Sequence, residues 1–267
     1  MKIPFFFLLL VCSATQAQEL FVATEPASNM PTGSIGLRLG NYWMKERNSS
    51  RFDYHLIPEI MWGANKNLML HADAFISNQD GRFTNEGGSF YGKYRFYTKD
   101  QVHAHFRMAA FGRYSFNNSN IHQEEIDLYG HNSGYQAGII ATQLLHKMAL
   151  SASAGYIRAE DNNSGNKMPA GQARDAFTYT FSFGKLMLPR TYTGYGQTNL
   201  NLMLELLGQT LAPNGKSYLD VVPSVQFIIN SQARIDIGYR RQLYSSMLRT
   251  SPNGAILRFE YLLFNVL

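Results

Sequence analysis

The sequence predicts an all-β protein, a transmembrane antiparallel up-and-down β-barrel of about twelve strands. Apolar and polar residues alternate with period two along most of the chain, which is the pattern of strands with two different faces. Charged residues make up only 16% of the 267 residues, against about 25% in an ordinary soluble domain, and aromatic residues reach 13%. The connections between alternating segments are by turns long and short, as in outer-membrane barrels.

The first residues have the pattern of an export signal. Lys2 precedes an apolar run at residues 3–12, which is too short to cross a bilayer as a helix, since that needs about 20 residues. Small and polar residues follow as far as Ala17. We therefore expect a signal peptide at residues 1–17, a separate segment at residues 18–32 and the barrel at residues 33–267. Cys12 is the one cysteine, so the exported chain is expected to need no disulfide.

Residues 51–62 show the alternation most clearly. Phe52, Tyr54 and Leu56 begin an apolar face, and Asp53 and His55 lie on the opposite face. A helix would scatter these residues around its circumference, whereas a strand sorts them onto two faces.

The same sorting recurs in every predicted strand. Each has an apolar face made of alternate residues and a more polar face between them. In chain order the twelve segments are residues 35–39, 51–62, 68–76, 90–96, 102–110, 135–142, 148–154, 177–183, 199–206, 219–227, 233–240 and 257–263.

Long connections follow the odd strands, for example residues 77–89, 117–129 and 159–174, and tight ones follow the even strands. The tight ones are residues 63–67, 98–101, 145–147 and 230–232, with residues 189–197 as a longer exception. The short-turn end, which also holds both ends of the barrel domain, is expected to face the periplasm.

A soluble β-sandwich or a lipocalin-like barrel would also alternate. Several segments here alternate over ten or more residues, close to the 9–11 or so that cross a bilayer, whereas soluble strands usually have about five or six. The membrane barrel is therefore the stronger interpretation. Pro58 and Pro223 lie inside predicted strands, so we expect a local bulge or a gap in the hydrogen-bond ladder there.

Residues 18–32 show no periodicity, and Pro26 and Pro31 bracket residues 27–30. We expect a periplasmic lead-in, with a short plug that enters the barrel as the alternative.

The run Ala23-Thr24-Glu25-Pro26-Ala27-Ser28-Asn29-Met30-Pro31 precedes a glycine-rich first strand with Gly33, Gly36, Arg38 and Gly40. This start resembles that of outer-membrane barrels grouped with the MetA-pathway phenol-degradation family of transporter-like proteins. The specific part covers under a tenth of the chain, although the strand layout resembles theirs throughout. The resemblance implies a barrel with a transport role, and no catalytic residue can be carried over from it.

The polar faces would line the lumen, and their charges are unevenly placed. Acidic residues gather on the second and third strands and basic residues on the fourth and fifth. These charges could pair and close the lumen, or they could create a transverse field that selects solutes. The predicted lumen residues are Arg38, Asp53, His55, Glu59, His71, Asp73, Lys93, Arg95, His103, His105, Arg107, Arg113, Glu205, Asp220, Arg234, Asp236, Arg240, Arg258 and Glu260.

His103 and His105 could in principle bind a metal, but no carboxylate stands beside them at ligand spacing, so we expect no metal and no cofactor. His131 and Ser133 resemble the His-x-Ser of outer-membrane phospholipase A and lipid A deacylase barrels. By parity with Tyr135 they are predicted on the lipid-facing side. The residue after the serine is Gly134 where those enzymes have Asn, and no orienting residue follows.

The sequence therefore predicts a monomeric outer-membrane barrel of a Gram-negative bacterium. Its predicted function is a channel or transporter for a small polar or aromatic solute, and its partners are outer-membrane lipid and that solute, without nucleic acid. A structural or surface barrel with a salt-bridged lumen is the first alternative, and a lipid hydrolase using His131 and Ser133 is the second.

Overall fold

The protein is a closed antiparallel barrel of twelve strands, as the alternation predicts. The structure, a computed structural model, describes residues 21–47, 49–79, 81–191 and 196–267. The predicted signal peptide at residues 1–17 lies outside the described residues. No helix in the described parts of the chain has the length and apolarity needed to cross a membrane.

The strands have 10 to 18 residues, enough to cross a bilayer when tilted. They are β1 (Ile35–Lys45), β2 (Phe52–Gly63), β3 (Leu68–Ser77), β4 (Thr84–Gln101), β5 (Ala104–Asn117), β6 (Ser133–Leu145), β7 (Met148–Glu160), β8 (Asp175–Leu188), β9 (Asn199–Leu211), β10 (Ser217–Ile229), β11 (Ala233–Ser245) and β12 (Asn253–Leu263).

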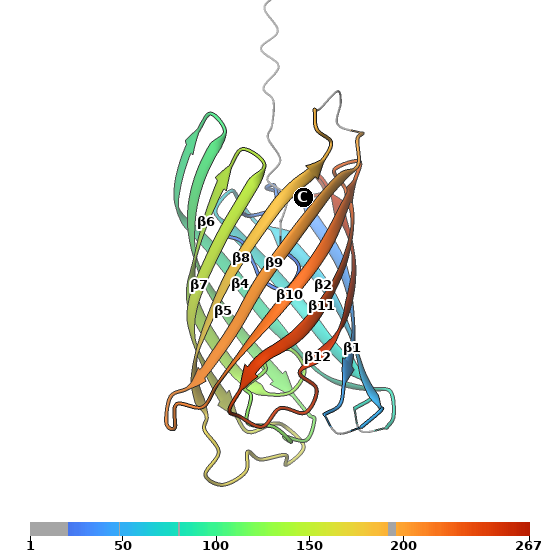
Figure 1. The fold of residues 1–267 in the computed structure, drawn as a ribbon, viewed down its shortest axis with the longest axis vertical. Coiled ribbons are helices and arrows are strands. Elements are labelled where there is room, and N and C mark those ends of the chain that lie inside the picture. Colours follow the sequence, from blue (N-terminus) through green and yellow to red (C-terminus); the bar gives the residue numbers. More distant parts are fainter. Residues whose placement is uncertain (1–20, 48, 80, 192–195) are drawn as a thin grey trace, which may run out of the picture.

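Each strand pairs with its neighbours in the sequence, and β1 closes the barrel against β12 (Figure 1). The closing pair runs in register from Ile35 opposite Leu263 to Lys45 opposite Asn253. No strand edge is left free, so every strand has two neighbours that can satisfy its backbone groups.

The connections sort to the two ends of the barrel as predicted. We call the upper end in Figure 1, which holds the C-terminus, the turn end, and the opposite end, with residues 118–132 and 161–174, the loop end. The prediction is wrong between β4 and β5. The turn lies at residues 102–103, not 98–101, because a register shift between Arg95 and Tyr97 breaks the alternation and β4 continues to Gln101.

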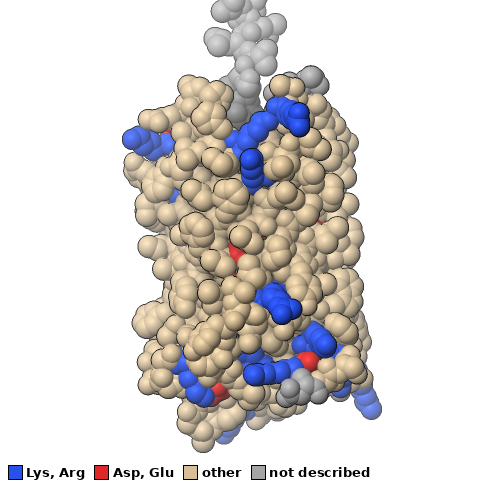
Figure 2. Space-filling model, in the orientation of Figure 1, with Lys and Arg blue, Asp and Glu red and all other residues tan. Residues whose placement is uncertain are grey.

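The two faces of the wall differ as the sequence predicts. Apolar side chains such as Leu202, Leu204 and Ile237 point outward and are about half exposed, while Asn201 and Glu205 on either side of the two leucines are buried. In the face that Figure 2 shows, Lys and Arg side chains lie mainly toward the two ends, and the middle is mostly uncharged. This distribution fits an apolar band between two polar margins.

The two prolines in strands are accommodated by gaps in the ladder, not by bulges. Pairing between β2 and β3 stops at Pro58 and resumes in the same register. Pairing between β10 and β11 does the same at Pro223. Each proline keeps a partner on its other neighbouring strand.

Candidate functional site: the barrel interior

Residues 21–31 lie inside the barrel near the turn end. Phe21, Val22 and Ala27 are at most 2% exposed, and Ser28 and Asn29 are also buried. We call residues 21–31 the N-terminal segment.

Glu205 on β9 is the main anchor of this segment. Its carboxylate, fully buried, accepts hydrogen bonds from the backbone N–H groups of Val22, Ala23 and Thr24 at 2.8–3.1 Å. Three consecutive N–H groups form a concave donor surface that suits one anion. A charge in the wall thereby satisfies backbone donors that no strand partner reaches.

Other strands hold the rest of the segment. Lys93 on β4 donates to the carbonyl of Pro26 at 2.8 Å and pairs with Glu25 at 3.2 Å. Thr142 on β6 accepts from the N–H of Ala27 at 2.9 Å. Contacts therefore come from well-separated parts of the barrel circumference.

At the loop end, residues 118–132, which we call the inner loop, fold into the barrel mouth. Glu125 pairs with Arg240 on β11 at 3.0 Å and with Arg249 at 2.7 Å. The backbone of Ile126 exchanges two hydrogen bonds with the Gln209 side chain on β9. Burial raises the pKa of Glu125, but the two guanidinium groups outweigh burial and lower it to about 2.

Arg249 joins the inner loop to the wall. It lies in the connection between β11 and β12, is 1% exposed and makes a bidentate pair with Asp220 on β10 at 2.7 Å. Its guanidinium also lies 3.9 Å from the centre of the Tyr218 ring.

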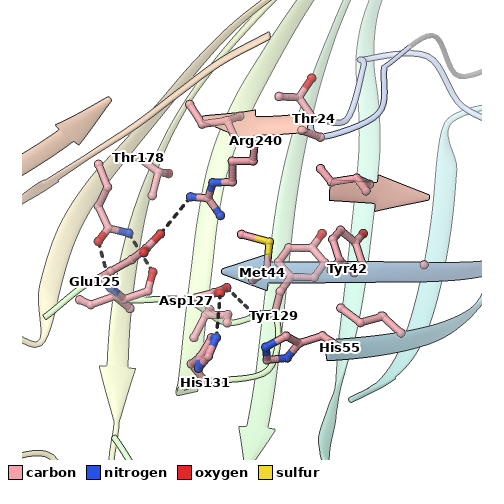
Figure 3. Close-up of a pocket in the computed structure, with 18 of the residues that line it drawn as sticks. Thr24, Tyr42, Met44, His55, Glu125, Asp127, Tyr129, His131, Thr178 and Arg240 are labelled. Carbon is pink, nitrogen blue, oxygen red and sulfur yellow. Dashed lines mark hydrogen bonds and ion pairs between the residues drawn. The ribbon is translucent and has the colours of Figure 1, made fainter. Parts of the chain in front are cut away.

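A cavity of about 300 Å³ lies in the barrel interior beside both elements. Residues 22–25 line it on one side and residues 123, 125–129 and 131 of the inner loop on another, with wall strands around it. Tyr42, Met44 and Tyr129 give it an aromatic and thioether surface, and Figure 3 shows these side chains near Arg240. The lining thus combines apolar area with a few polar groups, as small-molecule sites do.

Two imidazoles meet at one side of this cavity. His55 on β2 and His131 of the inner loop have ring centroids 5.2 Å apart, and Asp127 lies 3.8 Å from His131 (Figure 3). Among the described residues, no group of three or more His, Cys, Asp or Glu side chains is arranged to hold a metal ion.

Most predicted lumen residues are buried in the interior, where acids and bases pair. The closest pairs are Arg38 with Glu59 and Glu260, Arg113 with Asp73, Arg234 with Glu260 and Asp236, Arg258 with Asp236, Arg240 with Asp220, and His71 with Glu59. Asp53 instead accepts a hydrogen bond from Ser251 at 2.5 Å. Arg113 on β5 thus pairs with Asp73 on β3, two strands along the wall, and the other pairs lie on one strand or on adjacent strands.

Four predicted lumen residues lie at the turn end. His103 is in the exposed turn at residues 102–103 and stacks on His146, with ring centroids 5.3 Å apart. His105 contacts Asp100 at 2.8 Å, and Arg95 donates to a backbone carbonyl at 2.5 Å. Arg107 reaches Ser28 of the N-terminal segment at 3.0 Å. These side chains do not join the cavity.

The prediction that His131 and Ser133 face lipid is wrong. His131 lines the interior cavity, and Ser133 is 5% exposed. The Ser133 hydroxyl accepts from the N–H of Asn117 at 2.8 Å. Gly134, with φ +145°, breaks the alternation after Ser133, so parity with Tyr135 does not hold. The arrangement required for a hydrolase at the lipid surface is absent from this pair.

Sequence reasoning missed Glu125, Arg249, Gln209, Tyr129 and Tyr218. Three of these lie in connections without periodicity, where no face can be assigned. The signal that could have indicated them is the placement of Glu124-Glu125 and Arg249 in two polar connections at the same end of the barrel.

The fold resembles that of a known outer-membrane channel. A crystal structure of an outer membrane channel from Pseudomonas putida F1 aligns with a TM-score of 0.57 at 11% identity, over 91% of this chain and 100% of that chain. The NanC porin aligns with a TM-score of 0.48 at 11% identity, over 85% of this chain and 98% of that one. No family model and no curated protein matches the sequence. The chain thus has the fold of an outer-membrane channel barrel.

Proposed function

We propose that the protein is an outer-membrane channel or transporter that passes a small polar or aromatic solute through its interior. The observation that carries this proposal is the cavity of about 300 Å³ inside the barrel, beside the N-terminal segment and the inner loop. Its size is at the lower end of small-molecule sites, which span roughly 300–1,000 Å³.

The lining supports the class of solute. Tyr42, Tyr129, Tyr218 and Met44 offer surfaces on which an aromatic ring can stack. His55 and neighbouring side chains offer hydrogen-bonding groups to a polar substituent. A solute with one ring or a few polar groups would use both kinds of surface.

In this proposal residues 21–31, the described part of the predicted segment at residues 18–32 apart from its last residue, form a plug and not a free periplasmic lead-in. The burial of residues 21–31 and their bonds to Glu205, Lys93 and Thr142 support a plug. Passage then requires the segment to shift or to leave a path beside it.

The cellular setting follows the same proposal. The outward band of apolar side chains would face outer-membrane lipid, and residues 1–17 would direct export. The strands of the described residues close into one barrel within a single chain, and we propose that this chain acts as a monomer.

A structural barrel with a closed lumen is the second candidate. The pairs of Arg113 with Asp73 and of Arg38 with Glu59 and Glu260 favour it, because they link strands to one another on the polar face. Removing either partner of such a buried pair destabilises the fold, because the other charge is left buried without compensation.

Conductance in planar bilayers tests the two candidates. Wild-type protein, Glu205→Ala and the control Glu160→Ala, whose side chain is exposed at the end of β7, are refolded and compared. We expect Glu205→Ala to conduct more than wild type, because the N-terminal segment loses its anchor, and Glu160→Ala to match wild type. If all three are silent and addition of small aromatic solutes to folded protein gives no binding, the structural barrel is supported instead.

A further inference from the structure

We propose that residues 127–131 of the inner loop form a proton-sensitive gate over the cavity, which leaves the wall when His55 and His131 are both protonated. This inference deepens the channel function proposed above and rests on it. It concerns how pH controls the access of the solute to the cavity.

The inner loop docks against β2 and β3 through an imidazole contact, and against β5, where Ser115 donates to the Leu128 carbonyl at 2.9 Å and Arg113 donates to the Tyr129 hydroxyl. His55 projects inward from β2 and is 7% exposed, and the His131 ring lies over it with centroids 5.2 Å apart. Gly130, with φ +118°, lies against both strands: a Cβ there would be in ordinary van der Waals contact, 3.7 Å from Nδ1 of His55 and 3.9 Å from Cβ of Phe75. The backbone at Gly130 thus places the His131 ring beside the His55 ring.

The charges around the pair are unequal. Asp127 lies 3.8 Å from Nε2 of His131, and Glu125 is on the same loop. On the wall, the nearby titratable groups are Asp53 on β2, which bonds Ser251, Tyr42 on β1, and Glu86 on β4, which bonds Ser77 on β3. Asp127 can offset the positive charge of an imidazolium at His131. A second imidazolium, at His55, then repels the first across the contact.

The direction of the pH effect follows from proton linkage. A histidine in water has a pKa of about 6.5, so once the loop is released and water reaches both rings, His131 and the wall residue His55 bind protons as the pH falls below that value. The docked loop holds fewer protons, since two imidazolium rings in contact repel each other. Acid therefore shifts the equilibrium toward the released loop.

The rest of the inner loop stays in place over this pH range. Glu125, with its pKa lowered to about 2, remains an anion and keeps its pairs with Arg240 and Arg249. The bonds of Ile126 to Gln209 do not titrate. We therefore expect motion of residues 127–131 about an anchor at residues 123–126.

Thiol reactivity measures this motion without relying on transport. The sole native cysteine is Cys12, so an introduced cysteine is a clean reporter in the exported chain. Leu128→Cys and Ile126→Cys both replace side chains that are 2% exposed, and Asn120→Cys gives an exposed reference on the same loop. Each rate is divided by that of Asn120→Cys at the same pH, which removes the pH dependence of the reagent.

Between about pH 7.5 and about pH 5, we expect the relative rate at Leu128→Cys to rise roughly tenfold and that at Ile126→Cys to stay constant. His131→Asn should abolish the rise. His122→Asn, which removes an exposed histidine of the same loop, should preserve it. A constant rate at Leu128→Cys, or a rise that survives His131→Asn, would overturn the gate.

Hydrogen exchange of the wild-type chain covers the case in which Leu128→Cys itself loosens the loop. The N–H groups of His131 and Asn132 donate to the carbonyl of Asp127 within the loop, so their protection reports whether the turn at residues 127–132 stays closed and shielded from water. Their protection, compared with that of residues 161–167, should fall at the lower pH, and unchanged protection would refute the gate. A protein that shows this pH response and never conducts would contradict the channel function alone; one that conducts and lacks the response would contradict the gate alone.

Discussion

The N-terminal segment and the inner loop both fill the lumen, one toward each end, but they are held in opposite ways. The segment offers mainly backbone groups to side chains of the wall, such as Glu205 and Lys93. The inner loop offers its own side chain, Glu125, to arginines of the wall and of a neighbouring connection.

The difference decides where specificity is encoded. Binding of a segment through its N–H and C=O groups depends little on the side chains of the segment. The residues of the wall therefore determine whether it binds. A loop bound through a buried carboxylate depends on one residue and on the arginines around it. Changes in the wall should therefore loosen the segment, and changes in either partner should loosen the loop.

The largest expected effect is on the loop. Arg249→Ala leaves Glu125 and Asp220 with only part of their buried compensation, and breaking such a pair costs about 3–5 kcal/mol. Denaturant unfolding in detergent should show that loss. Arg174→Ala, which breaks an exposed pair with Asp161, is the control and should change stability by about 0–1 kcal/mol. If Arg249→Ala and Arg174→Ala lowered the free energy of unfolding equally, the buried pairs of Arg249 would contribute no more than an exposed pair, contrary to this prediction.

Acid should weaken the anchor of the inner loop at residues 123–126 only at low pH. The lowered pKa of Glu125 contributes stability that is present above its unfolded value of about 4.3 and is lost as the pH falls through about 2. That shift corresponds to about 3 kcal/mol. The stability difference between wild type and Glu125→Gln should shrink between about pH 4.5 and about pH 2, and a difference independent of pH would show that the charge of Glu125 is not what holds the loop.

The N-terminal segment should respond to its wall anchor. Glu205→Ala leaves the N–H groups of Val22, Ala23 and Thr24 without their acceptor, at a cost of about 1–3 kcal/mol. Glu205→Gln keeps an acceptor oxygen and should cost less. Protection of these three amides in hydrogen exchange is the measurement, and full protection in Glu205→Ala would mean that other contacts hold the segment.

The smallest effects should come from side chains of the segment itself. Ala23→Ser keeps the backbone donor and should change stability by no more than about 0.5 kcal/mol. Ala23→Pro removes the N–H that reaches both oxygens of Glu205 and should cost about 1 kcal/mol more. If the serine variant is as damaging as the proline variant, the segment is recognised through its side chains.

The alternation of residues such as Phe52, Asp53 and Tyr54 was sufficient to predict twelve strands, their outward and inward faces and the two kinds of connection. It works because a closed wall with an apolar outside and a polar inside requires period two throughout. It fails where a local backbone feature changes the parity. The register shift between Arg95 and Tyr97 moved a turn, and Gly134 turned Ser133 inward.

The interior contacts could not be predicted in the same way. Glu125 and Arg249 are 124 residues apart and lie in connections without periodicity, so nothing in the sequence pairs them. Glu205 could be placed on the polar face, but its partners are backbone N–H groups, which every residue except proline carries. An acceptor for backbone donors has no sequence signature.

The closing pair of β1 and β12 also has a consequence for folding. Ile35 and Leu263 are brought together from opposite ends of the barrel domain, whereas every other strand pair joins neighbours in the sequence. Non-local pairing is slow because the chain between the two strands loses conformational entropy before the new contact stabilises the fold. The N-terminal segment bonds to strands as distant as β12, through the carbonyl of Phe21 and Arg258. Its entry into the lumen therefore belongs to the same late step as closure of the barrel. An assembly intermediate would be an open, curved sheet whose N-terminal segment has not yet entered the lumen.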